Sequence, residues 1–232
     1  ALDAPASISP ALQAALQALA DSRGDQRGQV AVGLPSRVAR TLSASLVADF
    51  HRRFPRAVIT VSEVTSSVLC EWLLLGRVNV ALLLDPPRSG DMELELLHTE
   101  ELVLVGPSAH RGARASKTLS LEDLPSYPLI LPRVPNATRS VLEAAVGKRG
   151  IHLDVVTEAD TVQSILELVT ARLGYALLPH GSVKKDGEKF SVMHFGPPGL
   201  HQGIFMATSK RQRRGVLVGE IERLLRSFDL PK

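Results

Sequence analysis

The stretch that decides the fold is residues 61–84, VSEVTSSVLCEWLLLGRVNVALLL. An alternating segment ends at Thr65-Ser66-Ser67, apolar residues with helical spacing continue to Gly76, and a nearly all-apolar segment follows. This order predicts a β-α-β unit with hydroxyl groups where the strand gives way to the helix. In such units the carboxyl end of the strand and the amino end of the helix face one crevice, where small ligands bind. The stretch contains no nucleophile with a base, so it indicates binding rather than catalysis.

Composition narrows the class of protein. The chain has 232 residues, 44% of them hydrophobic and 22% charged, as in globular proteins of one large or two small domains. The formal net charge of +3 is too small on its own to indicate a nucleic-acid-binding surface. The single cysteine, Cys70, excludes an intrachain disulfide and suits a reducing compartment, so we expect a cytoplasmic protein. No apolar run approaches the roughly 20 residues of a membrane-spanning helix, so no membrane contact is expected.

Alternating strand and helix patterns cover the rest of the chain. Strands are expected at residues 30–34, 57–64, 94–97, 102–105, 129–131, 153–157, 175–178 and 203–208. Helices are expected behind Ser9-Pro10, from Val38 to Phe54, after the N-cap Asn136, after Asp160 with Gln163 as a capping box, and at the C-terminal end.

A β-α-β-α-β series therefore occurs twice, with a linking pair of strands between the two series. Parallel crossovers place helices on both faces of each sheet. We expect an α/β protein of two Rossmann-like lobes around a cleft, each lobe with its own sheet. The late strand and the last helix are expected to return to the first lobe, which gives two crossover strands.

Five segments carry a family resemblance: RGQVAVGLPS (27–36), EVTSSVLCEWLLLGRVNVALL (63–83), EELVLVGP (100–107), LILPRVPNATR (129–139) and ARLGYALLP (171–179). In this order and spacing they resemble the effector-binding domain of LysR-type transcriptional regulators, in particular the branch of the nitrogen assimilation control proteins. The resemblance runs from about residue 29 to residue 228.

The resemblance implies a fold like that of type 2 periplasmic binding proteins, with an inducer in the cleft. It assigns residues 1–27 to the end of a linker helix and a linker, 28–105 and 203–232 to the first lobe, and 106–202 to the second. It implies DNA binding through an N-terminal helix-turn-helix, which we expect to be missing from this chain. It also implies dimers that assemble into tetramers, so a homodimer or homotetramer is expected.

In the first lobe, the resemblance places the effector at the loop after the first strand and at the loop before the second helix. The matching residues are Ser36 with Arg37, and Thr65 with Ser66. Hydroxyl and backbone N–H groups at a helix start suit a carboxylate, sulfate or phosphate. The same hydroxyls also cap helices, and for Ser66 both roles stay open.

In the second lobe, the candidate residues lie at a strand end and at two helix starts. They are Pro132, Arg133, Asn136, Arg139, Asp160 and Thr161. A cation near a helix N-terminus is unfavourable by roughly 0.3–1 kcal/mol, and a charge-assisted hydrogen bond to an anion returns about 1.5–3 kcal/mol. The two arginines therefore favour an anionic partner, the alternative being solvated arginines or a salt bridge between the lobes. For Asp160 and Thr161, which precede the other second-lobe helix, the capping role is preferred.

Other side chains give no support for chemistry. The seven histidines lack metal-ligand spacing, no nucleophile or phosphate-loop motif occurs, and no cofactor, catalytic residue or metal is expected. Cys70 is interpreted as a small buried side chain rather than a redox sensor. The basic run at residues 210–214 is interpreted as a solvated turn rather than a DNA contact.

The predicted function is that of a ligand-sensing regulatory domain that binds a small anionic effector between two lobes. One departure concerns Val64, which stands where the family often has glycine and would narrow the cleft. The alternative is a periplasmic solute-binding protein of a transporter, which would have the same fold. An enzyme would need an acid–base pair in the cleft, and the sequence shows none.

Overall fold

The computed structural model describes residues 27–108, 118–183, 189–212 and 215–228. The helix expected behind Ser9-Pro10 lies outside these ranges. The strands are β1 (Gly28–Leu34), β2 (Ala57–Glu63), β3 (Val80–Leu84), β4 (Met92–Pro107), β5 (Thr118–Leu119), β6 (Leu129–Leu131), β7 (Val155–Glu158), β8 (Tyr175–Pro179), β9 (Phe190–Phe195) and β10 (Leu200–Ser209). The helices are α2 (Ser36–Arg53), α3 (Ser66–Leu74), α4 (Ala137–Gly147), α5 (Val162–Thr170) and α6 (Val216–Ser227), with 3-10 turns η1 (Leu121–Ser126) and η2 (His180–Ser182).

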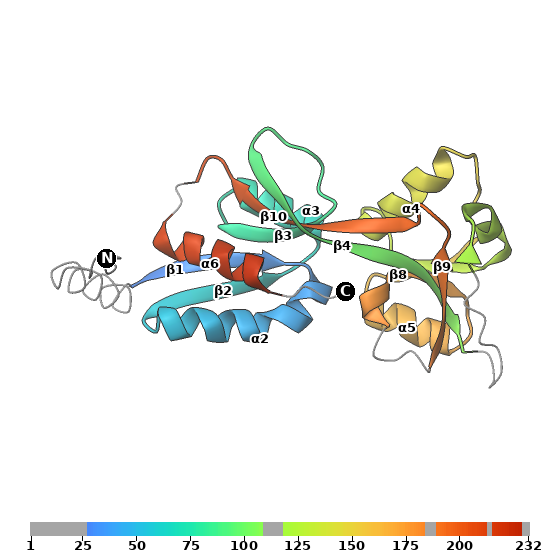
Figure 1. The fold of residues 1–232 in the computed structure, drawn as a ribbon, viewed down its shortest axis with the longest axis horizontal. Coiled ribbons are helices and arrows are strands. Elements are labelled where there is room, and N and C mark those ends of the chain that lie inside the picture. Colours follow the sequence, from blue (N-terminus) through green and yellow to red (C-terminus); the bar gives the residue numbers. More distant parts are fainter. Residues whose placement is uncertain (1–26, 109–117, 184–188, 213–214, 229–232) are drawn as a thin grey trace, which may run out of the picture.

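The first lobe is a sheet with helices on both faces (Figure 1). Strands β2, β1 and β3 are parallel, and β10 pairs antiparallel with β3. Side chains alternate across a strand, so Val80 and Leu82 of β3 pack with α2 and α6, whereas Ala81 and Leu83 pack with α3. The expected β-α-β unit at residues 61–84 is confirmed in this lobe.

The second lobe repeats this arrangement. Strands β7, β6 and β8 are parallel, β4 pairs antiparallel with β8, and β9 pairs with β4 and β5. Leu102 and Leu104 of β4 pack on the side of α4, and Val103 and Val105 on the side of α5. Strand β9 and the short β5 were not expected from the sequence.

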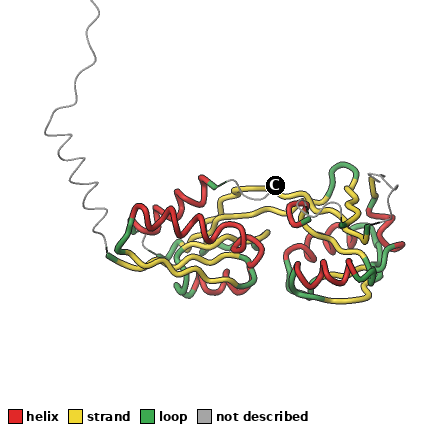
Figure 2. The backbone as a smooth tube through the Cα atoms, turned by 90° about the horizontal axis from the view of Figure 1, so that it is seen from below, coloured by secondary structure: helices red, strands yellow, loops and turns green. Residues whose placement is uncertain are grey.

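Two long strands connect the lobes, as Figures 1 and 2 show. Strand β4 is one strand of 16 residues, so the expectation of separate strands at residues 94–97 and 102–105 is wrong. The polar residues at positions 98–101 suggested a break, but they lie where β4 passes between the two cores. Strand β10 runs antiparallel to β4 over its whole length, from Leu200 to Ser209.

The expectation of two separate sheets is also too simple. Because β4 and β10 belong to both lobes, hydrogen bonds link the strands in one path, β2-β1-β3-β10-β4-β8-β6-β7. The apolar cores nevertheless stay separate, two in each lobe. The boundaries assigned to the lobes stay a prediction, and we propose that the first lobe ends before Leu102, since residues 102–105 pack in the second lobe.

Candidate functional site

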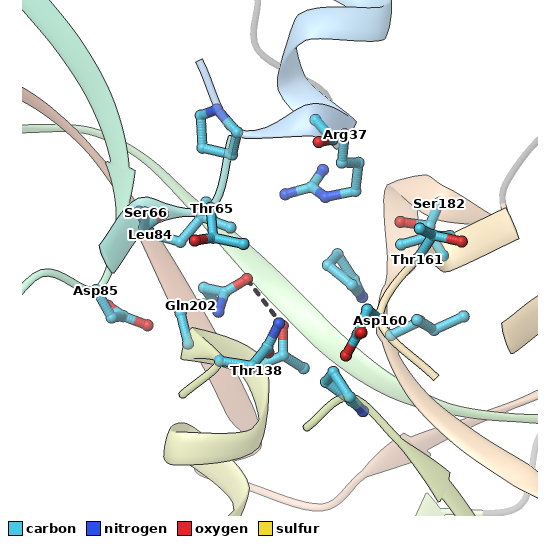
Figure 3. Close-up of a pocket in the computed structure, with 18 of the residues that line it drawn as sticks. Arg37, Thr65, Ser66, Leu84, Asp85, Thr138, Asp160, Thr161, Ser182 and Gln202 are labelled. Carbon is cyan, nitrogen blue, oxygen red and sulfur yellow. Dashed lines mark hydrogen bonds between the residues drawn. The ribbon is translucent and has the colours of Figure 1, made fainter. Parts of the chain in front are cut away.

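A cleft of about 850 Å³ lies between the lobes (Figure 3). Its walls come from the segments that follow the carboxyl ends of β1, β2, β3, β6, β7 and β8, the place where ligands bind in parallel α/β folds. Of the predicted site residues, eight line it: Ser36, Arg37, Thr65, Ser66, Pro132, Asn136, Asp160 and Thr161. Arg133 and Arg139 are not among the lining residues.

The start of α2 brings two arginines to the cleft. Its N-cap is Pro35, which offers no side-chain acceptor, and its first turn contains no acidic residue. Arg37 pairs with Glu100 of β4, with one N–H···O distance of 2.8 Å between Nη1 and Oε1. Glu100 is only 2% exposed, so this ion pair is buried. Arg40, one turn further along, is exposed and has no ion-pair partner among the residues that the structure describes.

The start of α3 also faces the cleft without a side-chain cap in the described part of the chain. Thr65 is the N-cap residue, but its hydroxyl lies 3.1 Å from the Ser67 hydroxyl and accepts no helix N–H. The Ser66 hydroxyl accepts the N–H of Leu84 at 3.0 Å, so Ser66 ties α3 to the end of β3 and does not cap the helix. The first-turn N–H groups of α3 are therefore available to an anion.

The second-lobe helices differ, because their own side chains cap them. Asn136 accepts the N–H of Arg139 at 3.2 Å, so the predicted N-cap of α4 is confirmed. Thr161 accepts the N–H of Ser164 at 3.1 Å and caps α5. The capping role preferred for Asp160 and Thr161 is therefore confirmed for Thr161 and wrong for Asp160, whose carboxylate does not cap the helix.

Arg133 and Arg139 are held by carboxylates of their own lobe. Arg133 donates from Nε to both oxygens of Asp160, at 3.1 and 3.2 Å, and these hydrogen bonds hold the pKa of the Asp160 carboxyl below its usual range. Arg139 donates to Glu143 at 2.7 Å and pairs with Glu158. The ion pairs lie within the second lobe rather than between the lobes. An anion would have to displace these carboxylates, so the predicted anion-binding role of both arginines stays a prediction without structural support.

Sequence analysis did not identify three residues that lie at the middle of the cleft, namely Gln202, Thr138 and Asp85. Gln202 of β10 is fully buried, and its Oε1 accepts from the Thr138 hydroxyl of α4 at 3.3 Å (Figure 3). Asp85, after β3, accepts the N–H of Gly203 at 3.0 Å, and partial burial raises the pKa of its carboxyl. The only available signal was a polar glutamine within the otherwise apolar stretch of residues 202–207.

Two further expectations concern Cys70 and metals. Cys70 lines the cleft, and burial raises the pKa of its thiol, which disfavours the reactive thiolate.

Within the described ranges, no group of three or more His, Cys, Asp or Glu side chains is placed to hold a metal ion. Val64 lines the cleft, and its narrowing effect stays a prediction. No helix in the described part of the chain is both long and apolar enough to cross a membrane.

Two α/β lobes around a polar-rimmed cleft define a hinged ligand-binding module. A model of the LysR substrate binding domain family matches residues 23–228, so the chain belongs to this family and the resemblance is confirmed. The HTH-type transcriptional regulator BbuR of Bordetella bronchiseptica is 30% identical over 159 residues, which cover 68% of this chain and 49% of BbuR. The nitrogen assimilation regulatory protein nac of Klebsiella aerogenes is 25% identical over 160 residues, 68% of this chain and 51% of nac.

The chain thus spans about half the length of these two relatives. Among solved structures, the effector binding domain of QuiR in complex with shikimate superposes with a TM-score of 0.75 at 16% identity, over 86% of this chain and 95% of that one. This likeness confirms the two-lobed fold. Because the relatives are transcription regulators, a periplasmic transport protein is not favoured.

Proposed function

We propose that this domain senses a small anionic effector in the cleft between its lobes. In the full-length regulator, occupancy of the cleft would control DNA binding by a helix-turn-helix domain. The protein would then act in the cytoplasm with its DNA, as a homodimer or homotetramer. Family membership supports a sensing role, and QuiR, which binds shikimate, is a carboxylate-binding example of the same fold.

The observation that carries the proposal is the first-lobe wall of the cleft. The N-termini of α2 and α3 both face it without a side-chain cap among the described residues, and Arg40 adds an exposed cation without an ion-pair partner there. A cation in the first turns of a helix is unfavourable until an anion binds between it and the N–H groups. The second-lobe caps by Asn136 and Thr161 leave that wall less suited to an anion.

The mechanism is a shift between open and closed lobes. An effector that contacts both walls binds the closed form more tightly and favours it. To move the balance from 1:99 to 99:1, it must prefer the closed form by about 10⁴-fold.

Thermal unfolding of the purified domain with carboxylates, phosphate and sulfate tests the proposal. We expect at least one anion class to raise the melting temperature and the Arg40→Gln variant to lose about tenfold in affinity, the equivalent of one charge-assisted hydrogen bond. The exposed Arg52, which pairs with Asp49 away from the cleft, supplies the control Arg52→Gln, with unchanged affinity. The proposal would be contradicted if no anion raised the melting temperature of the wild type. It would also be contradicted if the anions raised the melting temperature of Arg40→Gln as much as that of the wild type and of Arg52→Gln.

The assembly is tested separately by native mass spectrometry of the purified domain. The measurement reports the number of subunits and any small molecule retained in the cleft in one experiment. A monomer at micromolar concentration would contradict the proposed homodimer.

A further inference from the structure

Gln202 is completely buried, yet only one end of its amide has a partner within the described part of the chain. Its Oε1 accepts from the Thr138 hydroxyl, whereas its Nε2 has no partner among the described residues. Exchanging the oxygen and nitrogen of the amide does not help, because Thr138 can satisfy only one of the two ends. A buried donor without an acceptor destabilises a protein, so such a group needs an explanation. Gln202 lines the cleft, so the residue that carries the unsatisfied donor borders it (Figure 3).

The position of Gln202 on the crossover strands is specific. In the antiparallel ladder of β4 and β10, Gln202 lies directly opposite Glu100. Glu100 is bonded to Arg37 at the start of α2 in the first lobe, and Gln202 is bonded to Thr138 at the start of α4 in the second lobe. This cross-strand pair thus connects the hinge to one helix of each lobe.

We propose that the Gln202 amide donates a hydrogen bond to a neutral oxygen of the effector. The effector would then be a monocarboxylate that also carries a hydroxyl or carbonyl oxygen. This inference rests on the proposed function, which puts the carboxylate at the uncapped helix starts beside Arg40. A second carboxylate at Gln202 is disfavoured, because Glu100 lies opposite this residue and already neutralises Arg37. A ligand ammonium at this point would leave Nε2 without an acceptor.

The apolar side chains that line the rest of the cleft indicate the chemistry of the part of the effector between its polar groups. Apolar side chains of both lobes line the cleft, among them Val64, Leu84 and Ile165. The apolar walls suit a hydrocarbon skeleton between the carboxylate and the neutral oxygen, as is usual for small-molecule sites. The hydrogen bond at Gln202 then links the ligand to the strand through which the lobes move.

Matched probes test this inference. The first series is propionate, glycolate and malonate, and the second is benzoate, 3-hydroxybenzoate and isophthalate, so within a series the members differ only in the group at one position, which is apolar, a hydroxyl or a second carboxylate. Binding to the wild type is measured by calorimetry, beside Gln202→Met and the control Gln29→Met at an exposed glutamine bonded to Thr60. We expect the hydroxyl member of at least one series to bind about tenfold more tightly than its two companions, the equivalent of one hydrogen bond.

In Gln202→Met this tenfold preference should vanish, while Gln29→Met should keep it. If the carboxylates bind the wild type without preference for the hydroxyl member, or the preference survives in Gln202→Met, the inference is overturned and the proposed function stands. If no carboxylate binds the wild type, the carboxylate chemistry of both proposals is overturned.

Two further measurements do not depend on affinity. The side-chain NH₂ resonance of Gln202 in ¹⁵N-labelled wild type, assigned by its loss in Gln202→Met, should shift on saturation with the preferred hydroxyl probe. A resonance that stays unmoved overturns the inference. Without ligand, Gln202→Met should melt close to the temperature of the wild type, because the loss of the Thr138 hydrogen bond is offset by the removal of an unsatisfied buried donor. A destabilisation well above the roughly 1 kcal/mol of that single hydrogen bond would indicate that Nε2 already has a partner, against the inference.

Discussion

Two arginine–carboxylate pairs near the cleft differ in burial. The side chains of Arg37 and Glu100 are 15% and 1% exposed, whereas those of Arg133 and Asp160 are 67% and 53% exposed. An exposed pair contributes little because water and salt screen it. A buried pair is sensitive to the loss of one partner, because the remaining charge is left in a medium of low polarity.

We therefore expect Arg37→Met to lower the free energy of unfolding by about 3–5 kcal/mol, since it leaves the Glu100 carboxylate buried without its cation. The matched control Arg133→Met should cost less than about 1 kcal/mol. Urea denaturation of both variants measures the difference. Adding Glu100→Leu to Arg37→Met should restore much of the loss, and a double variant no more stable than the single one would argue against a charge effect.

Only some residues of the site could be predicted from the sequence, because local features can be read from it and ion pairs between distant residues cannot. A motif places Ser36, Thr65 and Thr161 at helix starts because strand ends and caps are local features of the sequence. Whether an arginine faces the cleft depends on distant carboxylates: Glu100 in one case and Asp160 in the other. Sequence spacing contains no information about such pairs, so Arg37 and Arg133 both stood among the predicted site residues.

At the level of elements, hydrogen bonding divides the helices that border the cleft into two classes. Helices α4 and α5 have side-chain caps, and α2 and α3 have none within the described residues. Both α3 and α5 have a threonine at the N-cap, so the residue type alone does not decide the cap. The hydroxyl of Thr161 turns to its helix, whereas that of Thr65 turns to Ser67.

This difference predicts unequal effects of the same substitution. Thr161→Ala should lower the free energy of unfolding by about 1 kcal/mol, the usual cost of a lost N-cap, whereas Thr65→Ala should change it much less. Denaturant unfolding of the two variants is the measurement. Equal losses would mean that Thr65 also caps its helix in solution.

The strands show where local patterns are sufficient and where they are not. β-α-β units were predictable because a buried parallel strand is apolar throughout and an amphipathic helix repeats every three to four residues. Strand β4 was divided because polar residues at 98–101 interrupt its apolar pattern. That interruption reflects the passage between two cores, which is a property of the tertiary structure.

At the scale of the whole molecule, β4 and β10 are the strands that lie in both lobes, and each lobe keeps its own cores. Such a molecule changes the angle between its lobes more easily than the packing within a lobe, because close-packed cores resist deformation. Ligand binding should therefore act on the hinge and leave the lobes intact.

Small-angle X-ray scattering with and without a saturating carboxylate tests this expectation. The radius of gyration should fall on binding as the cleft closes, while hydrogen exchange in the cores around Leu82 and Leu104 should change only by the overall stabilisation. Arg40→Gln at the same anion concentration supplies the control and should stay open in proportion to its lost affinity. If the carboxylate binds and the radius of gyration stays unchanged, the effector does not bridge the lobes. A ligand with equal affinity for the open and closed forms does not shift the balance between them.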